Sequence, residues 1–174
     1  RQLRERIGFV PQKALLFRGT IRENIAYGKP DATEEEILAA AKTAQALEFI
    51  REKPGGLDAP VAQLGQNFSG GQKQRLSIAR ALVRRPEVYI FDDSFSALDA
   101  KTDAALRAAL KETTGDATVL IVAQKVSTVM DADRILVLDG GGCVGMGTHR
   151  ELLQSCPVYQ EIVYSQMSAE EVEA

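Results

Sequence analysis

The chain has few of the residues from which metal centres and membrane spans are built. Its 174 residues include two cysteines and one histidine. Cys143 and Cys156 match no metal-binding spacing, and two isolated thiols suit a reducing compartment without excluding a disulfide. Apolar runs such as Thr118–Ala123 fall far short of the ~20 residues that span a bilayer, and no signal peptide is visible. The sequence therefore indicates neither a cysteine metal centre nor a membrane-spanning segment.

An excess of positive charge is also missing. The chain has 21 Lys and Arg against 24 Asp and Glu, a formal net charge of −3. The basic residues are scattered, and nothing suggests a nucleic-acid partner. Five of them fall near the end of one expected helix, where we interpret them as a solvated face that favours the helix dipole. These are Lys73, Arg75, Arg80, Arg84 and Arg85.

Apolar residues are plentiful, at 45% of the chain, which is enough for one domain with its own core. The first residue is Arg1 and not Met, within a charged segment that leads into a β-like run at Ile7–Val10. We therefore expect the chain to be part of a longer protein.

The first half predicts one strand and two helices. Ile7–Val10 reads as a strand that stops at Pro11. Thr33 and Glu36 form a capping box at the start of a helix within Asp31–Gln45. The glycines and prolines of Lys53–Asn67 predict an irregular connector. Ser69, Gly70 and Gly71 then open a second helix, which ends before Pro86.

The middle of the chain predicts a parallel sheet. Glu87–Phe91 is nearly continuously apolar, as in a strand that is buried on both faces. Lys101–Glu112 reads as a helix, and Thr118–Ala123 as a second buried strand. Strand, helix and strand in succession imply a right-handed parallel crossover. The predicted class is α/β.

The last part predicts an antiparallel addition. Arg134–Leu138 and Cys143–Met146 flank a glycine-rich turn, as in a hairpin. Thr148 and Glu151 form a capping box for a closing helix. His149, in the first turn of that helix, is better interpreted as a surface histidine than as a catalytic one. We expect a disordered tail at residues 168–174.

The stretch N-F-S-G-G-Q-K-Q-R, residues 67–75, carries the first candidate site. Gly70 and Gly71 let the backbone approach a ligand closely, and the helix behind them presents free N–H groups and a positive dipole end. Ser69 adds a hydroxyl donor, so the unit can grip a phosphate. An ordinary Ser-Gly-Gly turn that caps a helix explains the tripeptide about equally well.

Asp92 is the second candidate, because it stands where an expected parallel strand ends. Open α/β sheets bind their ligands at such ends. A carboxylate there can hold Mg²⁺, directly or through water, while nucleotide phosphates complete the metal's shell. The alternative is a strand-end aspartate that caps a turn.

Taken together and in order, these motifs resemble the ATP-binding-cassette (ABC) family, and the resemblance runs over nearly the whole chain. Five motifs carry the resemblance. Val10-Pro11-Gln12 resembles the Q-loop, S-G-G-Q-K-Q-R (69–75) the signature motif, Tyr89–Asp92 the Walker B strand, and Ser96-Ala97-Leu98-Asp99 the D-loop. The stretch L-L-F-R-G-T-I-R-E-N-I (15–25) is similar to the segment by which exporters of the family meet their membrane domains.

The resemblance implies a P-loop NTPase-like fold over 1–167, with a parallel sheet core and a helical subdomain at about 13–85. ATP and Mg²⁺ are the implied cofactors. Gln12 and Asp92 would contact the metal, and Gln12 would also contact the attacking water and relay to the membrane domain. Two such domains would face head to tail, each holding ATP against the other's signature. The implied nucleotide-binding residues are Ser69, Gly70, Gly71, Gln72 and Asp99.

Three departures from the family pattern matter most. The phosphate loop G-x-x-x-x-G-K-[ST] is absent and would lie upstream of Arg1, so the chain resembles the C-terminal part of a cassette. Asp93 stands where hydrolytic members have Glu, with roughly 1.5 Å less reach, and a misplacement of about 1 Å can cost on the order of 10²-fold in rate. Gln124 stands at the switch-histidine position and cannot carry a histidine's charge. Gln63 stands where exporters often have Glu, which is weak further support for a degenerate site.

We therefore expect the degenerate-site subunit of a heterodimeric ABC exporter, with a second ABC subunit and transmembrane domains as partners. It would act on the cytoplasmic face of the plasma (inner) membrane, and the chain alone would be inactive. Three alternatives stay open. They are a self-sufficient hydrolytic cassette in which Asp93 is the base, a non-membrane cassette ATPase of the chromosome-organising or translation-factor type, and a regulatory cassette that binds nucleotide without turnover.

Overall fold

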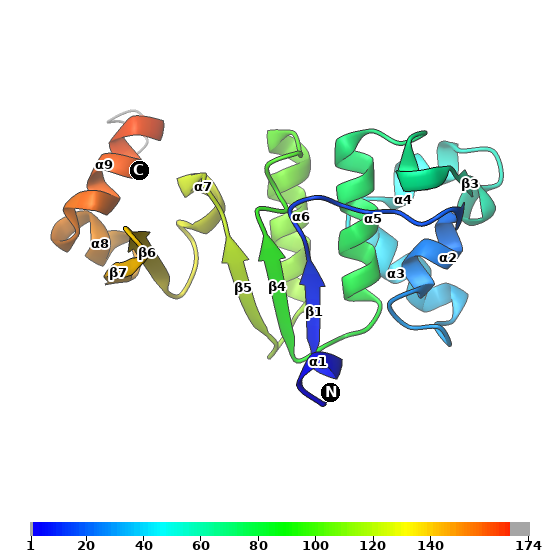
Figure 1. Ribbon diagram of the computed structural model, residues 1–174, viewed down its shortest axis with the longest axis horizontal. Helices are drawn as coiled ribbons and strands as arrows, with labels where there is room; N and C mark the ends of the chain where they lie inside the picture. Colours follow the sequence, from blue (N-terminus) through cyan, green and yellow to red (C-terminus); the bar gives the residue numbers. More distant parts are fainter. Residues whose placement is uncertain (1, 168–174) are drawn as a thin grey trace. The chain divides into compact units, whose positions relative to one another are not determined.

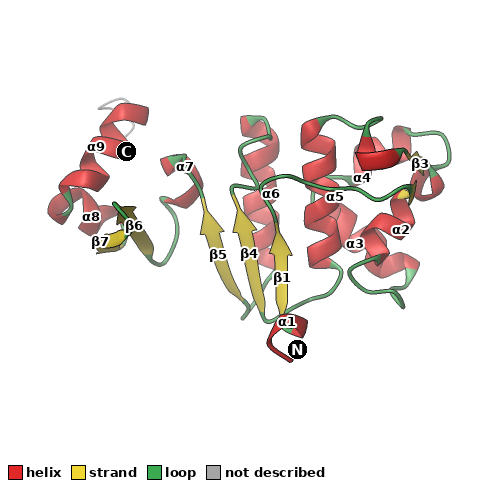
Figure 2. Cartoon of the chain, in the orientation of Figure 1, coloured by secondary structure: helices red, strands yellow, loops and turns green. Residues whose placement is uncertain are grey.

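The computed structural model describes residues 2–167, which fall into two compact units. The first ends at Val122 and the second begins at Ala123. Helices and strands follow one another along the chain in both (Figures 1 and 2). The predicted α/β class is confirmed.

A parallel sheet forms the centre of the first unit (Figure 1). Its strands are β1 (Ile7–Val10), β4 (Val88–Asp92) and β5 (Thr118–Val122), in the order β1-β4-β5. Val10 is level with Phe91, and Asp92 with Val122, so the carboxyl ends of the strands meet at one edge. The short helix α1 (Gln2–Glu5) precedes β1.

Two longer helices bury the apolar side chains of this unit. α5 (Gly70–Leu82) packs against β1, and α6 (Ala100–Thr113) connects β4 to β5, which confirms the predicted parallel crossover unit. Leu76 of α5, Phe91 of β4 and Leu106 of α6 are fully buried in one core. The sequence pattern predicts all three elements to within one or two residues, apart from the end of α5.

A group of short elements lies beside α5 (Figure 1). α2 and α3 both pack against α5. The predicted irregular connector is not wholly irregular, because β3 pairs antiparallel with β2. The elements are β2 (Gly19–Thr20), α2 (Ile21–Ala26), α3 (Glu34–Thr43), α4 (Leu47–Glu52), η1 (Gly56–Asp58), β3 (Pro60–Val61) and η2 (Gln63–Gly65).

Burial of the sheet differs from the prediction. In β4, Tyr89 and Phe91 are buried while their neighbours are only partly so. β5 is mostly exposed, with Leu120 at 48% and Val122 at 51%. Within the described residues, the side chains that alternate away from the core of this unit are exposed, so the predicted burial on both faces is not observed in this part of the protein.

The second unit contains α7 (Val126–Val129), a hairpin, α8 (His149–Ser155) and α9 (Pro157–Gln166). The hairpin of β6 (Ile135–Asp139) and β7 (Gly142–Gly147) confirms the prediction. Its turn holds Gly140 and Gly141 at φ of 54° and 81°, which glycine adopts without strain.

The predicted single closing helix is instead two helices. The capping box of Thr148 and Glu151 begins α8 as predicted. Pro157 then starts α9, because a residue without an N–H is tolerated at a helix's first position but not in its interior. Leu152, Tyr159 and Val163 from these helices complete the core of this unit. The predicted tail at 168–174 lies outside the described residues.

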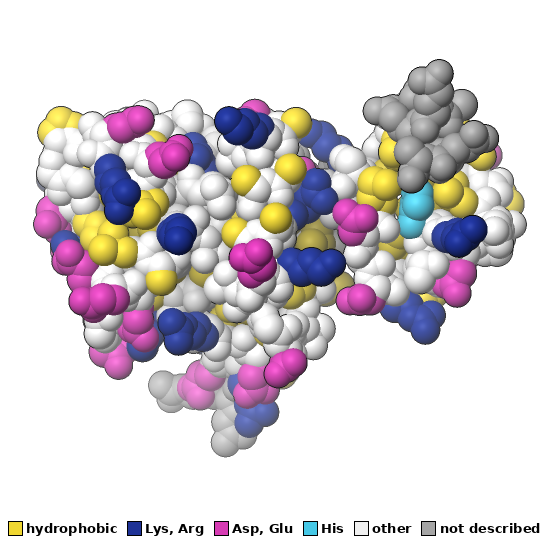
Figure 3. Space-filling view, turned by 180° about the vertical axis from the view of Figure 1, so that it is seen from behind, with side chains coloured by type: hydrophobic (Ala, Val, Ile, Leu, Met, Phe, Trp, Pro, Cys, Tyr) yellow, Lys and Arg dark blue, Asp and Glu magenta, His cyan; other side chains and the backbone are white. Residues whose placement is uncertain are grey.

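Between residues 2 and 167, no helix is both long and apolar enough to cross a membrane. On the face drawn in Figure 3, basic side chains are interspersed with acidic ones.

Candidate functional site

The carboxyl ends of β1 and β4 bring Gln12 and Asp93 together. β1 ends at Val10, Pro11 ends its hydrogen-bonding pattern, and Gln12 begins the crossing to the helices. Gln12 Nε2 donates a hydrogen bond to Asp93 Oδ2 at 3.0 Å. Two residues that the family resemblance predicts near the reacting end of a nucleotide are therefore in direct contact.

The turn after β4 is fixed by both neighbouring strands. Asp93 has a φ of 44°, a left-handed conformation in which Asp is found more often than most residues. Its N–H donates to Val122 O at 2.8 Å, and the fully buried Ser94 donates from Oγ to Val10 O at 3.0 Å. The Asp93 carboxylate is thus presented on a rigid turn.

The oxygen donors at this edge fit a magnesium ion that shares its shell with phosphates. Asp92, the last residue of β4, offers a carboxylate, and Gln12 keeps its amide oxygen, because only its nitrogen bonds Asp93. Over residues 2–167, no three His, Cys, Asp or Glu side chains group closely enough to hold a metal by themselves. Mg²⁺ is usually bound through one or two carboxylates, water and substrate phosphates, and not by an all-protein cage.

The signature residues build the start of α5. Ser69 Oγ accepts from Gln72 N at 3.2 Å, and Gln72 Oε1 accepts from Ser69 N at 3.1 Å, so the two residues form a capping box. A Cβ on Gly70 would meet nothing within 4 Å, whereas one on Gly71 would lie 3.2 Å from Ala97 O of the D-loop. Gly71 is therefore needed for close packing within the chain, and Gly70 leaves open space at a helix N-terminus.

Asp99 caps α6. Its Oδ1 accepts from Thr102 N at 3.0 Å and its Oδ2 from Thr102 Oγ1 at 2.7 Å. The backbone hydrogen bond from Thr102, and then the hydroxyl, lower the pKa of Asp99. The structure thus gives Asp99 a capping role, and its predicted contact with nucleotide stays a prediction.

Two further predicted positions are on other segments of the chain. Gln124 belongs to the second unit, where its backbone oxygen accepts from Gln166 Nε2 at 2.8 Å. Gln63 opens η2 and is exposed.

His149 is not simply a surface residue. It is partly buried, its Nδ1 lies 2.7 Å from Tyr159 Oη, and the two rings meet edge to face. It therefore has a packing role within the second unit.

The interpretation of the basic residues on and just after α5 as a solvated face is wrong for Arg75 and Arg80, which are partly buried, whereas Arg84 and Arg85 are exposed. Arg75 donates to Gln45 O at 2.6 Å, Arg80 to Asn24 O at 2.8 Å, and Arg84 to Glu5 O at 3.0 Å. Burial lowers the pKa of both Arg75 and Arg80. These guanidinium groups satisfy backbone carbonyls that no strand or helix partner reaches.

Arg80 supports an aromatic patch that the sequence analysis missed. We define the aromatic patch as Leu15, Phe17 and Tyr27, all exposed. The rings of Phe17 and Tyr27 lie 4.7 Å apart, and the Arg80 guanidinium lies 5.0 Å from the centre of Phe17. Burial of large apolar side chains is the norm, so this exposure suggests a contact surface.

The buried amide of Asn24 holds the patch in place. Asn24 Oδ1 accepts from Phe17 N, and Nδ2 donates to Phe17 O, both at 2.8 Å. The signal was present in the sequence, since Asn24 lies at helical spacing among apolar residues, with Ile21 and Ile25 on the same face.

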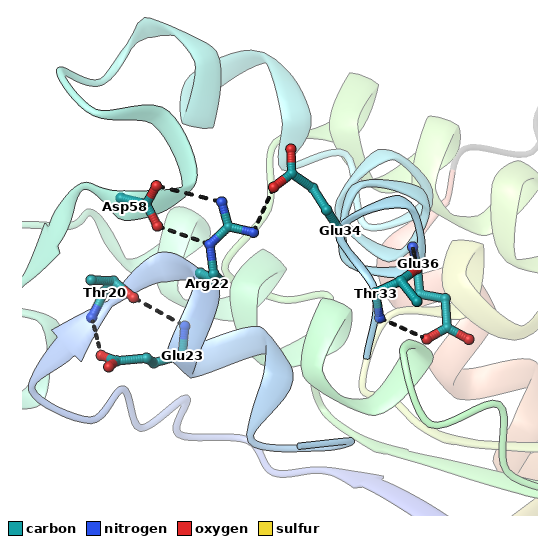
Figure 4. A network of polar contacts seen from close by, with 7 residues as sticks. All are labelled: Thr20, Arg22, Glu23, Thr33, Glu34, Glu36 and Asp58. Atoms are coloured by element: carbon teal, nitrogen blue, oxygen red, sulfur yellow. Dashed lines mark hydrogen bonds and ion pairs between the residues drawn. The ribbon is translucent and has the colours of Figure 1, made fainter. Parts of the chain in front are cut away.

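An ion network ties α2 to its neighbours (Figure 4). Arg22 donates to Asp58 Oδ1 at 2.8 Å and to Glu34 Oε2 at 2.8 Å, and so links α2, η1 and α3. The hydrogen bonds to Asp58 and Glu34 raise the pKa of Arg22, and the bond from Arg22 lowers the pKa of Asp58. The segment that carries Phe17 and Tyr27 is thus held by charge as well as by packing.

The fold and these motifs define a nucleotide-binding cassette, and comparison with known proteins agrees. The family model described as "ABC transporter" matches residues 1–96. The chain belongs to the ABC transporter family.

Relatives of the chain are long proteins of which it matches a part. It is 51% identical over 168 residues to the uncharacterized ABC transporter ATP-binding protein YfiB of Bacillus subtilis, covering 97% of this chain and 29% of that protein. It is 45% identical over 160 residues to a putative multidrug export ATP-binding/permease protein of Staphylococcus aureus, covering 92% and 28%. The chain therefore spans less than a third of the length of these curated relatives.

A solved structure shares the fold. The structure of a bacterial Atm1-family ABC exporter with ATP bound matches 95% of this chain and 29% of its own, with a TM-score of 0.92 and 40% sequence identity. The predicted ABC ATPase fold is thereby confirmed.

Proposed function

We propose that this chain forms part of the nucleotide-binding domain of a heterodimeric ABC exporter and that its own ATP site is degenerate. The full protein would couple ATP binding and hydrolysis to export of a substrate, on the cytoplasmic face of the plasma membrane. Its signature would complete the competent site of the partner subunit.

The contact between Gln12 and Asp93 carries the proposal. The shorter reach of Asp, compared with Glu, already separates its carboxylate from an attacking water. The hydrogen bond from Gln12 occupies Oδ2 of the Asp93 carboxylate, an oxygen that a base would need for the water's proton. Gln124 at the switch position has no titratable proton to offer in compensation.

The signature, by contrast, keeps every feature that a phosphate contact needs. Gly70 leaves room at the start of α5, and the helix dipole favours an anion there. Ser69 Oγ accepts the cap bond and donates to no other described residue, so its hydrogen is available to a phosphate oxygen.

Asp92 and Gln12 would hold the metal. A bound Mg²⁺ would offset phosphate charge and orient the nucleotide. The chain's own part is to present these oxygens at the sheet edge and to keep the Gln12 amide against Asp93.

The aromatic patch supports a membrane-domain partner. Leu15, Phe17 and Tyr27 form an exposed apolar surface, as a docking site for a partner requires. Arg80 joins that surface to α5, whose first residues are the signature. The part of α5 from Gly70 to Arg80, about 16 Å long at 1.5 Å per residue, would connect the docking surface to the phosphate contact.

The proposal is tested by restoring the longer carboxylate at position 93 and the titratable side chain at position 124. In the assembled full-length heterodimer, the partner's catalytic Glu is first neutralised so that only this subunit's own site is read. Asp93→Glu with Gln124→His should then raise phosphate release above that background. The 174-residue chain alone is the blank, since without the phosphate loop it should release none. A double variant that stays at background would show that some feature other than Asp93 and Gln124 limits the site.

A further inference from the structure

A cavity of about 350 Å³ lies in the first unit around the amino end of β4. Its walls come from α3, the ends of α5 and α6, and the start of β4. It is separate from the residues assigned to nucleotide, which gather at the carboxyl ends of the strands and at the start of α5. Its size is at the lower end of the ~300–1,000 Å³ typical of small-molecule sites.

Tyr89 presents an unused hydrogen-bond donor to this cavity. The residue is 3% exposed and lines the cavity, yet its phenol makes no hydrogen bond with any residue from 2 to 167. The phenol oxygen itself is accessible, so a ligand in the cavity can reach it. Burial raises the pKa of Tyr89, so the phenol keeps its proton and can donate it in a hydrogen bond.

Arg85 gives the cavity a positive charge. It is exposed, lines the cavity, and forms no ion pair within the described part of the chain. Glu36 also lines the cavity, but Lys29 Nζ lies 2.7 Å from both of its carboxylate oxygens and balances its charge. Arg85 also acts electrostatically on Glu36, so Lys29, Arg85 and Glu36 together leave a net positive charge at the cavity.

The remaining walls combine apolar side chains with threonine hydroxyls. Ala39, Leu82, Val83 and Pro86 supply hydrocarbon surface. The hydroxyls of Thr43 and Thr113, 3.4 Å apart, add polar atoms between α3 and α6. A ligand that fits must therefore combine an anionic group with a compact apolar body.

We propose that this cavity binds a small organic monocarboxylate with an apolar body of about phenyl size. Its carboxylate meets Arg85 and the Tyr89 hydroxyl, and its body contacts Leu82, Val83 and Pro86. This site is additional to the nucleotide site and does not depend on the degenerate-site proposal.

Ligand-observed fluorine NMR tests the site on the full chain with 4-fluorophenylacetate as the probe. The expected result is a saturable line broadening of the carboxylate, and binding about tenfold weaker for the neutral 4-fluorophenylacetamide, the difference of one charge-assisted hydrogen bond. Arg85→Gln should weaken carboxylate binding by a similar factor, Tyr89→Phe should weaken it less, and Ala39→Leu, which fills the cavity, should abolish it.

Matched variants separate this site from general surface binding. Arg51→Gln removes an exposed charge that does not line the cavity and should leave binding unchanged. Circular dichroism on each variant checks that the fold is kept, and Arg85 is exposed enough for its replacement to be tolerated. The proposal is overturned if the carboxylate and the amide bind equally, if neither binds at millimolar concentration, or if Ala39→Leu and Arg85→Gln both bind like the parent chain.

Discussion

Asp93 combines a short side chain with a hydrogen bond that occupies one of its carboxylate oxygens. Its carboxylate sits on a left-handed turn and accepts a hydrogen bond from Gln12. The Asp93 N–H bond to Val122 O and the Ser94 hydroxyl bond to Val10 O hold the backbone of the turn, so only rotation of the side chain can move the carboxylate. The short side chain and the fixed turn therefore both limit how far the Asp93 carboxylate can reach toward an attacking water.

The two signature glycines should respond differently to an added methyl group. Gly70→Ala meets no atom within 4 Å and should leave stability unchanged or raise it by up to about 1 kcal/mol. Gly71→Ala presses on Ala97 O at 3.2 Å and should cost about 1–3 kcal/mol. Urea denaturation of the chain measures both.

If nucleotide approaches Gly70, Gly70→Ala should nevertheless lower phosphate release in the assembled full-length transporter. Normal activity in a stable Gly70→Ala protein would show that the open space at Gly70 is not used by a ligand.

At the scale of elements, α5 connects the two surfaces on which the proposed function depends. Arg80 bonds Asn24 O and Leu15 O, which have no other donor of comparable geometry in this region. Arg80→Met should therefore destabilise the chain by about 1–3 kcal/mol, the cost of leaving the acceptors of the buried Asn24 unpaired. Arg80→Lys should recover only part of the lost stability, since an ammonium group cannot reproduce the planar set of donors of a guanidinium group.

Arg51→Met is the matched control for this prediction, because Arg51 is exposed on α4; it should change stability by less than about 0.5 kcal/mol. Equal denaturation midpoints for Arg80→Met and Arg51→Met would mean that Arg80 does not hold α2 to α5.

The Arg22 network predicts a pH-dependent stability. The hydrogen bond from Arg22 lowers the pKa of Asp58, so this contribution is present above the ordinary pKa of an aspartate and is lost as pH falls through the lowered value. The stability difference between the wild-type chain and Arg22→Gln should therefore shrink between pH 7 and pH 3. Urea midpoints at both values, with Arg51→Gln as control, measure it; a difference that grows on acidification would be inconsistent with the network.

Local signals in the sequence predict the main elements well. The capping boxes at Thr33 and Thr148 mark the starts of α3 and α8, and Pro86 limits the extent of α5. These features depend on residues a few positions apart, which is why the sequence pattern suffices.

Long-range contacts are what the sequence pattern does not contain. The bond from Gln12 to Asp93 joins residues 81 positions apart, and Arg80 reaches Asn24 across 56. Burial also depends on long-range contacts, because the alternation in β4 and the exposure of Leu120 are set by the face of the sheet that α5 and α6 cover. The sequence could nominate Gln12 and Asp93 separately, but only the fold brings them into contact.

At the scale of the whole molecule, the account divides the chain between two ATP sites. The signature at Ser69 and Gly70 is proposed to serve the partner's competent site, and Asp93 the weak one. The two sets of residues lie on different elements of this chain, the start of α5 and the end of β4, so each can be altered without directly changing the other.

Steady-state phosphate release at saturating Mg-ATP, from the wild-type heterodimer and two variants, tests this division most directly. Ser69→Arg places a bulky cation where the partner's nucleotide must dock and should abolish most of the activity. Asp93→Asn removes a base that contributes little and should leave most of it. If Asp93→Asn proves the more damaging change, this chain carries the working base and its own site is not degenerate.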